Sequence, residues 1–355
     1  MLGKNGIKHF GMKNYLRKIK LRNLPQPVFI LSIHRSGSTL LQSLLDGHDE
    51  LLVDVADSRY FSSLSKILKS NPLERKNIYK KDIIPYIFSM KSDYYKDFLS
   101  HISIDTLSES FDTYLKNKTG SFFDIFNAYV YALKVASNYY NSNPKYYLDK
   151  TLKSEYCKSI ILKWWPNVKI LCLVRDPRDI YASYKKRDIQ NNRPLTKVDA
   201  LVFTWRKSIE TVQYLLNKLG PEQCMLIKYE ELVSNKEKNI SKIASFLEIH
   251  FNDSLLTPTK GHGYVDWYGN AATGKKKQGI DSNEKNKYEK YLSNKEINKI
   301  ESLLEEHMKW LGYNLKTNPR SKINFPISVT KNQIRKYKYS IKEQSLVKTV
   351  LNESP

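Results

Sequence analysis

The sequence predicts an α/β protein of three layers, in which a mostly parallel sheet is flanked by helices on both faces. Two observations carry this prediction. Short apolar runs of strand length recur along the chain, and longer helical patterns separate them. The chain has 355 residues, 41% of them hydrophobic, so it is long enough to bury a sizeable core.

Four apolar runs are the strand candidates, at residues 28–33, 146–148, 168–174 and 225–229. Continuous apolar runs are typical of strands that are buried on both faces, as they are in a parallel sheet. Ligands of such sheets bind beyond the carboxyl ends of the strands. Residues that directly follow these runs are therefore the first candidates for a functional site.

Helical patterns occupy residues 122–140, 152–164, 196–219 and 236–247. A last amphipathic pattern covers 294–311 and stops at Gly312, as expected for a helix that ends at a glycine. Residues 60–120 are rich in Tyr and Lys with irregular helical patterning, and we expect a helical insertion there, beside the site. Residues 261–290 are rich in Gly, Asn and Lys and predict a long loop.

The charge is distributed unevenly, with 59 Lys and Arg against 36 Asp and Glu and a net charge of +23. Residues 1–23 carry seven basic residues and no acidic one, and residues 316–355 carry nine basic residues and two Glu. We expect these to be basic tails around a main domain at 24–315. They are either solvated tails or segments that attract anionic lipid, glycan or nucleic acid.

Three cysteines, Cys157, Cys172 and Cys224, lie in apolar or helical contexts without a CxxC spacing. They predict buried thiols in a reducing compartment. No window approaches 18 apolar residues, and the N-terminus lacks an apolar signal core. The expectation is a soluble, cytoplasmic protein without a transmembrane segment.

The hexapeptide HRSGST at residues 34–39 lies between a predicted strand and a helical pattern. Free backbone amides and the positive end of a helix dipole make such a turn an anion site. Arg35 adds a charged, forked donor. The turn is not a Walker A motif, because it has one glycine and no lysine. A phosphate or a sulfate is therefore the expected ligand.

A second motif, VRDPRDIYASY at residues 174–184, also follows a predicted strand. Arg175 lies at the end of that strand, and Ser183 follows about two helical turns later, so both can reach one phosphate. Pro177 suits the first turn of a helix. Asp176 and Asp179 are expected to cap the helix or to pair with Arg178.

The two motifs together resemble those of the sulfotransferase superfamily, which transfers a sulfuryl group from 3′-phosphoadenosine 5′-phosphosulfate (PAPS). The resemblance continues in YEELV at residues 229–233 and in WLGY at 310–313, and it covers most of 27–313. The RSGST form is closest to the tyrosylprotein and carbohydrate branches. The resemblance implies a P-loop-NTPase-like sulfotransferase fold, in which 60–120 is an insertion on the acceptor side.

The resemblance also implies which residues bind PAPS. Those for the 5′-phosphosulfate are Arg35, Ser36, Gly37, Ser38 and Thr39, those for the 3′-phosphate are Arg175 and Ser183, and the remaining nucleotide contacts are Tyr229, Thr273 and Lys287.

For catalysis, the tyrosylprotein branch places an acid and a basic residue after an LDAHP segment, and here LDGHD is followed by Asp57 and Arg59. Asp57 is the expected base, with Asp54 as the alternative, and Arg59 is an acceptor or sulfate contact. Lys150 and Arg35 are expected to stabilise the charge of the sulfonate. No metal is expected in the reaction.

The function implied is in-line transfer of a sulfuryl group to an acceptor hydroxyl, with release of 3′-phosphoadenosine 5′-phosphate (PAP). The acceptor can be a glycan, lipid, peptide or small alcohol, and the sequence does not choose among them. Two alternatives stay open: a P-loop nucleotide kinase or NTPase, and a non-catalytic polyanion-binding protein that uses the tails. No specific nucleic-acid partner is expected, and the oligomeric state is open.

Overall fold

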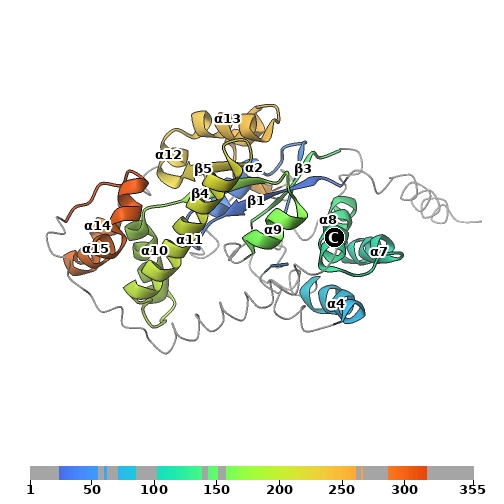
Figure 1. The fold of residues 1–355 in the computed structure, drawn as a ribbon, viewed down its shortest axis with the longest axis horizontal. Helices are drawn as coiled ribbons and strands as arrows, with labels where there is room; N and C mark the ends of the chain where they lie inside the picture. Colours follow the sequence, from blue (N-terminus) through green and yellow to red (C-terminus); the bar gives the residue numbers. More distant parts are fainter. Residues whose placement is uncertain are drawn as a thin grey trace, which may run out of the picture.

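The computed structural model describes residues 24–54, 60–61, 71–84, 102–137, 143–150, 157–260, 265–266 and 287–317. The two basic tails lie outside these residues, apart from 316 and 317. At the centre of the described part is a five-stranded sheet in the order β2-β3-β1-β4-β5 (Figure 1). Its strands are β1 (Gln26–Leu31), β2 (Leu51–Val53), β3 (Tyr146–Asp149), β4 (Lys169–Val174) and β5 (Cys224–Lys228). Every pairing between them is parallel, which confirms the predicted fold class.

The predicted strands match the observed ones to within two residues at each end, and two differences matter for the site. β1 begins and ends two residues earlier than predicted, which leaves residues 32–37 for the turn before α2. β2 was not predicted, because a run of three apolar residues is too short to show a period. The last predicted strand ends one residue early, at Lys228, and Tyr229 opens the short helix α12 (Tyr229–Ser234). Tyr229 therefore lies just past a strand end, where ligands of parallel sheets bind.

Helices cover both faces of the sheet (Figure 1). One face packs against α2 (Ser38–Leu45), α12 and α13 (Lys236–Leu247). The other packs against α8 (Phe122–Ala136), α9 (Lys158–Trp164), α11 (Val198–Leu219) and α15 (Asn294–Trp310). Apolar residues of both faces are buried, so the hydrophobic effect holds three layers together.

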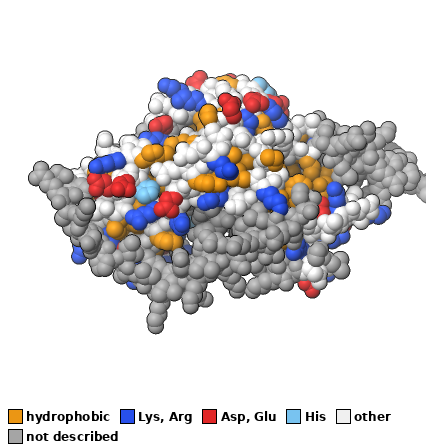
Figure 2. All heavy atoms as spheres, in the orientation of Figure 1, with side chains coloured by type: hydrophobic (Ala, Val, Ile, Leu, Met, Phe, Trp, Pro, Cys, Tyr) orange, Lys and Arg blue, Asp and Glu red, His pale blue; other side chains and the backbone are white. Residues whose placement is uncertain are grey.

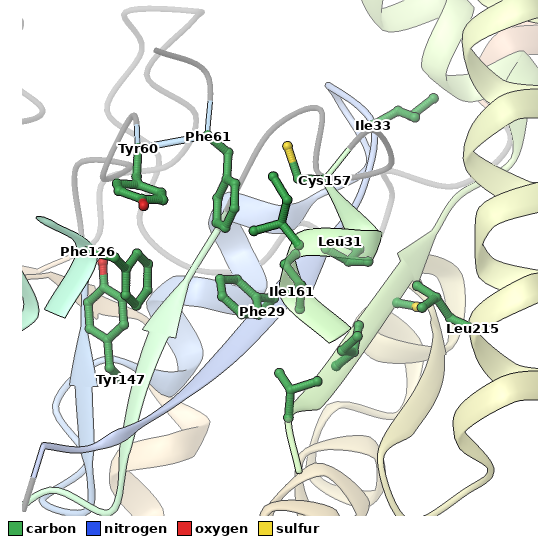
Figure 3. Close-up of a cluster of buried hydrophobic side chains, with 14 of the residues drawn as sticks. Phe29, Leu31, Ile33, Tyr60, Phe61, Phe126, Tyr147, Cys157, Ile161 and Leu215 are labelled. Atoms are coloured by element: carbon green, nitrogen blue, oxygen red, sulfur yellow. The ribbon is translucent and has the colours of Figure 1, made fainter. Parts of the chain in front are cut away.

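The side chains of β1 alternate between the two hydrophobic cores, one on each face of the sheet. Phe29 and Leu31 belong to the core beneath α8, α9 and α11, whereas Val28 and Ile30 belong to the core beneath α2 and α13. Figure 3 shows Phe29 and Leu31 pointing into the first of these cores. Successive side chains of a strand point to opposite faces, so a continuous apolar run is what this position requires.

The remaining described elements are α4 (Pro72–Ile78), η1 (Tyr79–Ile83), α7 (Ile104–Leu115), α10 (Pro177–Gln190), η4 (Asp253–Leu256), β6 (Thr259–Lys260), β7 (Val265–Asp266) and α14 (Tyr288–Tyr291). The 60–120 segment is mainly helical where it is described, and α7 packs along α8. The predicted loop at 261–290 is not all loop, because β7 pairs with β6 and α14 begins within it.

Most predicted helices are confirmed with small shifts at their ends. α13 has the predicted bounds, and α15 ends at Trp310, with Gly312 at a φ of 73°. α9 begins at Lys158, later than the predicted 152, and residues 151–156 lie outside the described ones. α11 begins two residues later than predicted, at Val198.

All three cysteines are buried free thiols, as predicted. Cys172 and Cys224 lie on the neighbouring strands β4 and β5, with their sulfur atoms 3.6 Å apart. Of the helices in the described part of the chain, none is both long and apolar enough to span a bilayer.

Candidate active site

Polar residues follow all five strands of the sheet. Asp54 follows β2, Lys150 follows β3, the turn with Arg35 follows β1, Arg175 follows β4, and Tyr229 follows β5. The strands are parallel, so these five positions lie along one edge of the sheet. This edge is where a ligand of such a sheet is expected.

The turn after β1 is shaped for an anion. The first bonds of α2 run from the amides of Leu40 and Leu41 to the carbonyl oxygen of Gly37. The amides of Ser38 and Thr39 therefore precede the helical ladder and are positioned to bind an anion. The hydroxyl of Ser36 is buried, with no hydrogen-bond partner in the described part of the chain. A buried polar group of this kind usually hydrogen-bonds to a ligand or a water molecule.

The two predicted phosphate motifs meet at Arg35. Its Nε donates to the hydroxyl of Ser183 at 2.8 Å, although the two residues are 148 positions apart. A guanidinium nitrogen of Arg175 donates to the carbonyl oxygen of Arg35 at 3.2 Å. Arg35 itself has a left-handed backbone, with a φ of 73°. The structure thus brings two arginines and a serine to one place beside the first turn of α2.

Tyr229 packs between this turn and Arg175. The guanidinium carbon of Arg175 lies 4.2 Å from the centre of the Tyr229 ring, a cation–π contact. On the other side, a Cβ atom at Gly37 would lie 2.3 Å from a carbon of that ring. Gly37 has a φ of 94°, so both the conformation and the close approach require glycine.

Asp176 and Arg178, which follow Arg175, have structural roles, as the sequence predicted. Asp176 caps α10 by accepting from the amide of Arg178 at 2.8 Å, and it also binds the Arg178 guanidinium. Glu301 on α15 is the second carboxylate partner of Arg178. Trp205 of α11 donates to the carbonyl oxygen of Arg175 at 3.0 Å. These contacts fix the backbone on which Arg175 is carried.

Lys150 reaches the same turn from β3. Its ammonium lies 3.3 Å from the hydroxyl of Thr39 in the first turn of α2. The residue is 8% exposed, so its charge lies in a largely desolvated setting at the strand ends. A positive charge here stabilises an anion bound at the α2 N-terminus.

Asp54 is built into a buried network that the sequence analysis missed. The hydroxyl of Tyr147 donates to its carboxylate at 2.9 Å, and Tyr129 also hydrogen-bonds to it. Burial, and then the Asp54 charge, raise the pKa of both tyrosines well above the ordinary value. Both phenols therefore stay protonated and serve as donors. Tyr147 and Asp54 are 93 residues apart in the sequence, so the local sequence pattern carries no signal of their contact.

Three other predicted site residues lie outside the described part of the chain, and a fourth, Lys287, is described. Asp57, Arg59 and Thr273 lie outside the described residues. Lys287 is half-buried and directly precedes α14, whose first amide, of Tyr288, donates to Asp179 of α10 at 2.9 Å. Lys287 therefore lies on the side of the molecule where α10 carries Ser183.

Comparison with known proteins points to one family. A family model described as the sulfotransferase family matches residues 27–253. A protein-tyrosine sulfotransferase of Drosophila melanogaster is 23% identical over 232 residues, which are 64% of this chain and 39% of the fly protein. Protein-tyrosine sulfotransferase 2 of Gallus gallus is 24% identical over 234 residues, 64% of this chain and 53% of the chicken protein.

Two solved structures share the fold. The sulfotransferase domain of the curacin biosynthetic pathway matches with a TM-score of 0.56 and 21% identity, over 82% of this chain and 99% of that one. The sulfotransferase domain of the Synechococcus PCC 7002 olefin synthase matches with a TM-score of 0.51 and 19% identity, over 83% and 97%.

The relatives contradict the predicted location, and the chain matches only part of their length. The predicted cytoplasmic location is contradicted, because the protein-tyrosine sulfotransferases to which the chain is related are Golgi membrane enzymes. The prediction rested partly on free cysteines, but fully buried thiols exchange poorly and do not report the redox state around the protein. The chain spans 39% of the fly relative and 53% of the chicken relative. With the motifs, the fold and the matched region in agreement, the chain belongs to the sulfotransferase family.

Proposed function

We propose that this chain transfers a sulfuryl group from PAPS to an acceptor hydroxyl and releases PAP. The observation that carries the proposal is the meeting of Arg35, Ser183 and Arg175 at the carboxyl edge of a parallel sheet. Two arginines in one site suit a ligand with more than one anionic group. PAPS has such a pair of groups, a 5′-phosphosulfate and a 3′-phosphate.

The turn at residues 36–39 would hold the 5′-phosphosulfate, together with Arg35. The amides ahead of the α2 ladder and the buried hydroxyl of Ser36 fit this group, since each offers a donor to an anionic oxygen. The close packing of Gly37 on Tyr229 lets the backbone approach the ligand without an intervening side chain.

The 3′-phosphate would lie against Arg175 and Ser183. Ser183 already accepts from Arg35, so its hydroxyl hydrogen remains available to donate to a phosphate oxygen. Tyr229, held beneath Arg175, would pack on the nucleotide. Thr273 and Lys287 are proposed as further nucleotide contacts on the strength of the family motifs.

For the chemical step, Asp57 would accept the proton of the acceptor hydroxyl as its oxygen attacks the sulfur. Lys150 and Arg35 would stabilise the charge of the sulfonate and of the departing phosphate. Arg59 is proposed as an acceptor or sulfate contact. Asp54 is the weaker candidate base, because two protonated tyrosines already hold its carboxylate in a buried network. No metal has a role in this proposed reaction.

The acceptor belongs to the class of hydroxyl compounds. Peptides with tyrosine come first, because the curated relatives are named protein-tyrosine sulfotransferases. Glycans, lipids and small alcohols follow. A screen of these acceptors with radiolabelled PAPS tests the proposal. Transfer of label by the wild type, lost in Lys150→Ala but kept in the exposed-residue control Arg193→Ala, is the expected result.

A nucleotide kinase or NTPase is the competing function. Its ligand would be ATP with Mg²⁺, and the site lacks the lysine and the second glycine of a Walker A turn. Mg²⁺-dependent ATP hydrolysis without transfer from PAPS would favour this alternative over sulfuryl transfer.

A further inference from the structure

We propose that His48, Asp49 and His250 form a binding site for a divalent metal ion of the zinc type. His48 and Asp49 lie in the turn between α2 and β2, and His250 follows α13. Glu50 directly precedes β2 and Lys145 directly precedes β3. The backbone amide of Lys145 donates a hydrogen bond to the carbonyl oxygen of Glu50 at 2.8 Å. The cluster therefore lies at the amino edge of the sheet, opposite the strand-end site, and the inference does not depend on the function proposed above.

The spacing of the three side chains matches a metal site. One carboxylate oxygen of Asp49 is 3.5 Å from Nδ1 of His48 and 3.5 Å from Nε2 of His250. The three ligand atoms all lie within 4.8 Å of one another. Tetrahedral zinc, with bonds of about 2.0–2.1 Å, places its ligand atoms about 3.3 Å apart. Small side-chain movements would bring all three atoms into coordination.

The hydrogen bonds around the cluster leave one ring nitrogen of each histidine unprotonated. Nε2 of His48 lies 2.9 Å from the carbonyl oxygen of His250, which can only accept, so the ring proton is on Nε2. Nδ1 of His48 is then the bare nitrogen. It accepts from the amide of Glu50 at 3.2 Å, which agrees with this tautomer.

His250 is oriented in the same way by a carboxylate. Its Nδ1 lies 2.9 Å from an oxygen of Glu50, so the proton is on Nδ1 and Nε2 is bare. The amide nitrogen of Asn252 is 3.1 Å from Nε2 and is positioned to donate to it. A carboxylate behind the distal nitrogen of a histidine is the usual support of a metal ligand, because it fixes the ring and raises its basicity.

These tautomers leave two unprotonated ring nitrogens close to one carboxylate oxygen. Each of the two lone pairs accepts a hydrogen bond, from the amide of Glu50 and from the side-chain amide of Asn252, and a bound ion would displace these two bonds. No ring proton lies between Asp49 and either histidine, so with neutral rings the cluster is negatively charged and lacks a cation of its own. A metal ion at the centre would supply that positive charge. Two imidazoles and one carboxylate, with water as a fourth ligand, are a donor set that suits Zn²⁺. Figure 2 shows histidine and acidic side chains together near the end of α13.

Such an ion would tie the α2–β2 turn to the segment after α13. His48 is fully buried, whereas the Asp49 side chain is 67% exposed, so the site opens to solvent on one side. An ion could enter from that side. The expected role is structural, since the site lies at the opposite sheet edge from Arg35.

The test uses the full chain after removal of metal with a chelator. Calorimetric titration with ZnCl₂ should show one ion per chain, and Co²⁺ should give the visible absorption of a tetrahedral site. At an ion concentration 100 times the dissociation constant, Tm should rise by about 4 °C. Asp49→Asn and His250→Gln change exposed side chains, so both variants should fold.

Both variants should weaken zinc binding at least about tenfold, whereas the control His307→Gln on α15 should bind like the wild type. Three results would overturn the proposal. They are no saturable binding to the wild type, equal binding by the Asp49 and His250 variants, and equal loss in the control. A change in PAP affinity on adding zinc would overturn the structural role. If the chain does not bind PAP at all, the function proposed above is wrong, and the zinc titration still tests the metal site.

Discussion

Replacing Gly37 with alanine tests the geometry of the anion turn. The new Cβ atom would lie 2.3 Å from a carbon of the Tyr229 ring, a distance that forces the ring to move. The φ of 94° adds backbone strain of about 1–2 kcal/mol for a residue with a side chain. Displacing the ring from Arg175 removes a cation–π contact of about 0.5–2 kcal/mol.

Gly312→Ala is the matched control. Gly312, at the end of α15, has a φ of 73°, and a Cβ atom there would lie 3.5 Å from the Lys228 ammonium, an ordinary van der Waals contact. This variant carries the backbone strain without the collision, so it should lose only about 1–2 kcal/mol of the free energy of unfolding. Gly37→Ala should lose about 1.5–4 kcal/mol, from the same strain together with the lost ring contact.

Urea unfolding measures the two free energies, and calorimetry with PAP measures the effect on the site. PAP affinity should fall at least tenfold in Gly37→Ala and stay unchanged in Gly312→Ala. Adding Tyr229→Ala to Gly37→Ala removes the collision, so the double variant should be more stable than the sum of the single losses predicts. Equal stability losses in the two glycine variants, with normal PAP binding in both, would refute the reasoning.

Three further predictions concern buried charges and hydrogen bonds. Glu301→Ala leaves the buried guanidinium of Arg178 with one carboxylate fewer and should lower the free energy of unfolding in urea by about 3 kcal/mol. The control Glu305→Ala on the same helix breaks an exposed ion pair with Lys309 and should lower it by under about 0.5 kcal/mol. Similar losses in the two variants would contradict the account. Burial raises the pKa of Glu301, but hydrogen bonds from Thr317, Lys316 and Arg178 outweigh it and hold that pKa below the ordinary value of 4.5. Its stabilising effect is therefore complete above pH 4.5 and lost below it, so the stability gap between the wild type and Glu301→Gln should shrink from pH 7 to pH 3, and a constant gap would contradict this. Tyr147→Phe removes a donor from the buried carboxylate of Asp54 and should cost about 1–3 kcal/mol in urea unfolding, so a neutral effect would contradict the proposed network.

The central features of the fold were predictable because their signals are local. β1 and β4 are continuous apolar runs, and the HRSGST turn leads directly into a helical pattern. The rule that parallel strands share a carboxyl edge then placed Arg35 and Arg175 in one site before any contact was known. Their contact confirms that step, while their roles in binding phosphate stay predictions.

Other features were not predictable, because their signals are either too short or too distant in sequence. β2 has three residues, and β5 passes directly from Lys228 into α12 at Tyr229, with no glycine or proline to mark the boundary. The pairing of Tyr147 with Asp54 and of His48 with His250 joins positions 93 and 202 residues apart. Only the folded chain brings such polar side chains together.

The measurement that tests the central claim most directly compares PAP with adenosine 5′-monophosphate, which differs by the 3′-phosphate alone. Calorimetry on the wild type should show PAP binding about 10- to 150-fold more tightly, the effect of one charge-assisted contact of about 1.5–3 kcal/mol. In Arg175→Ala this ratio should fall close to one, and in Arg193→Ala it should persist. Equal affinity of the wild type for the two nucleotides would contradict the account.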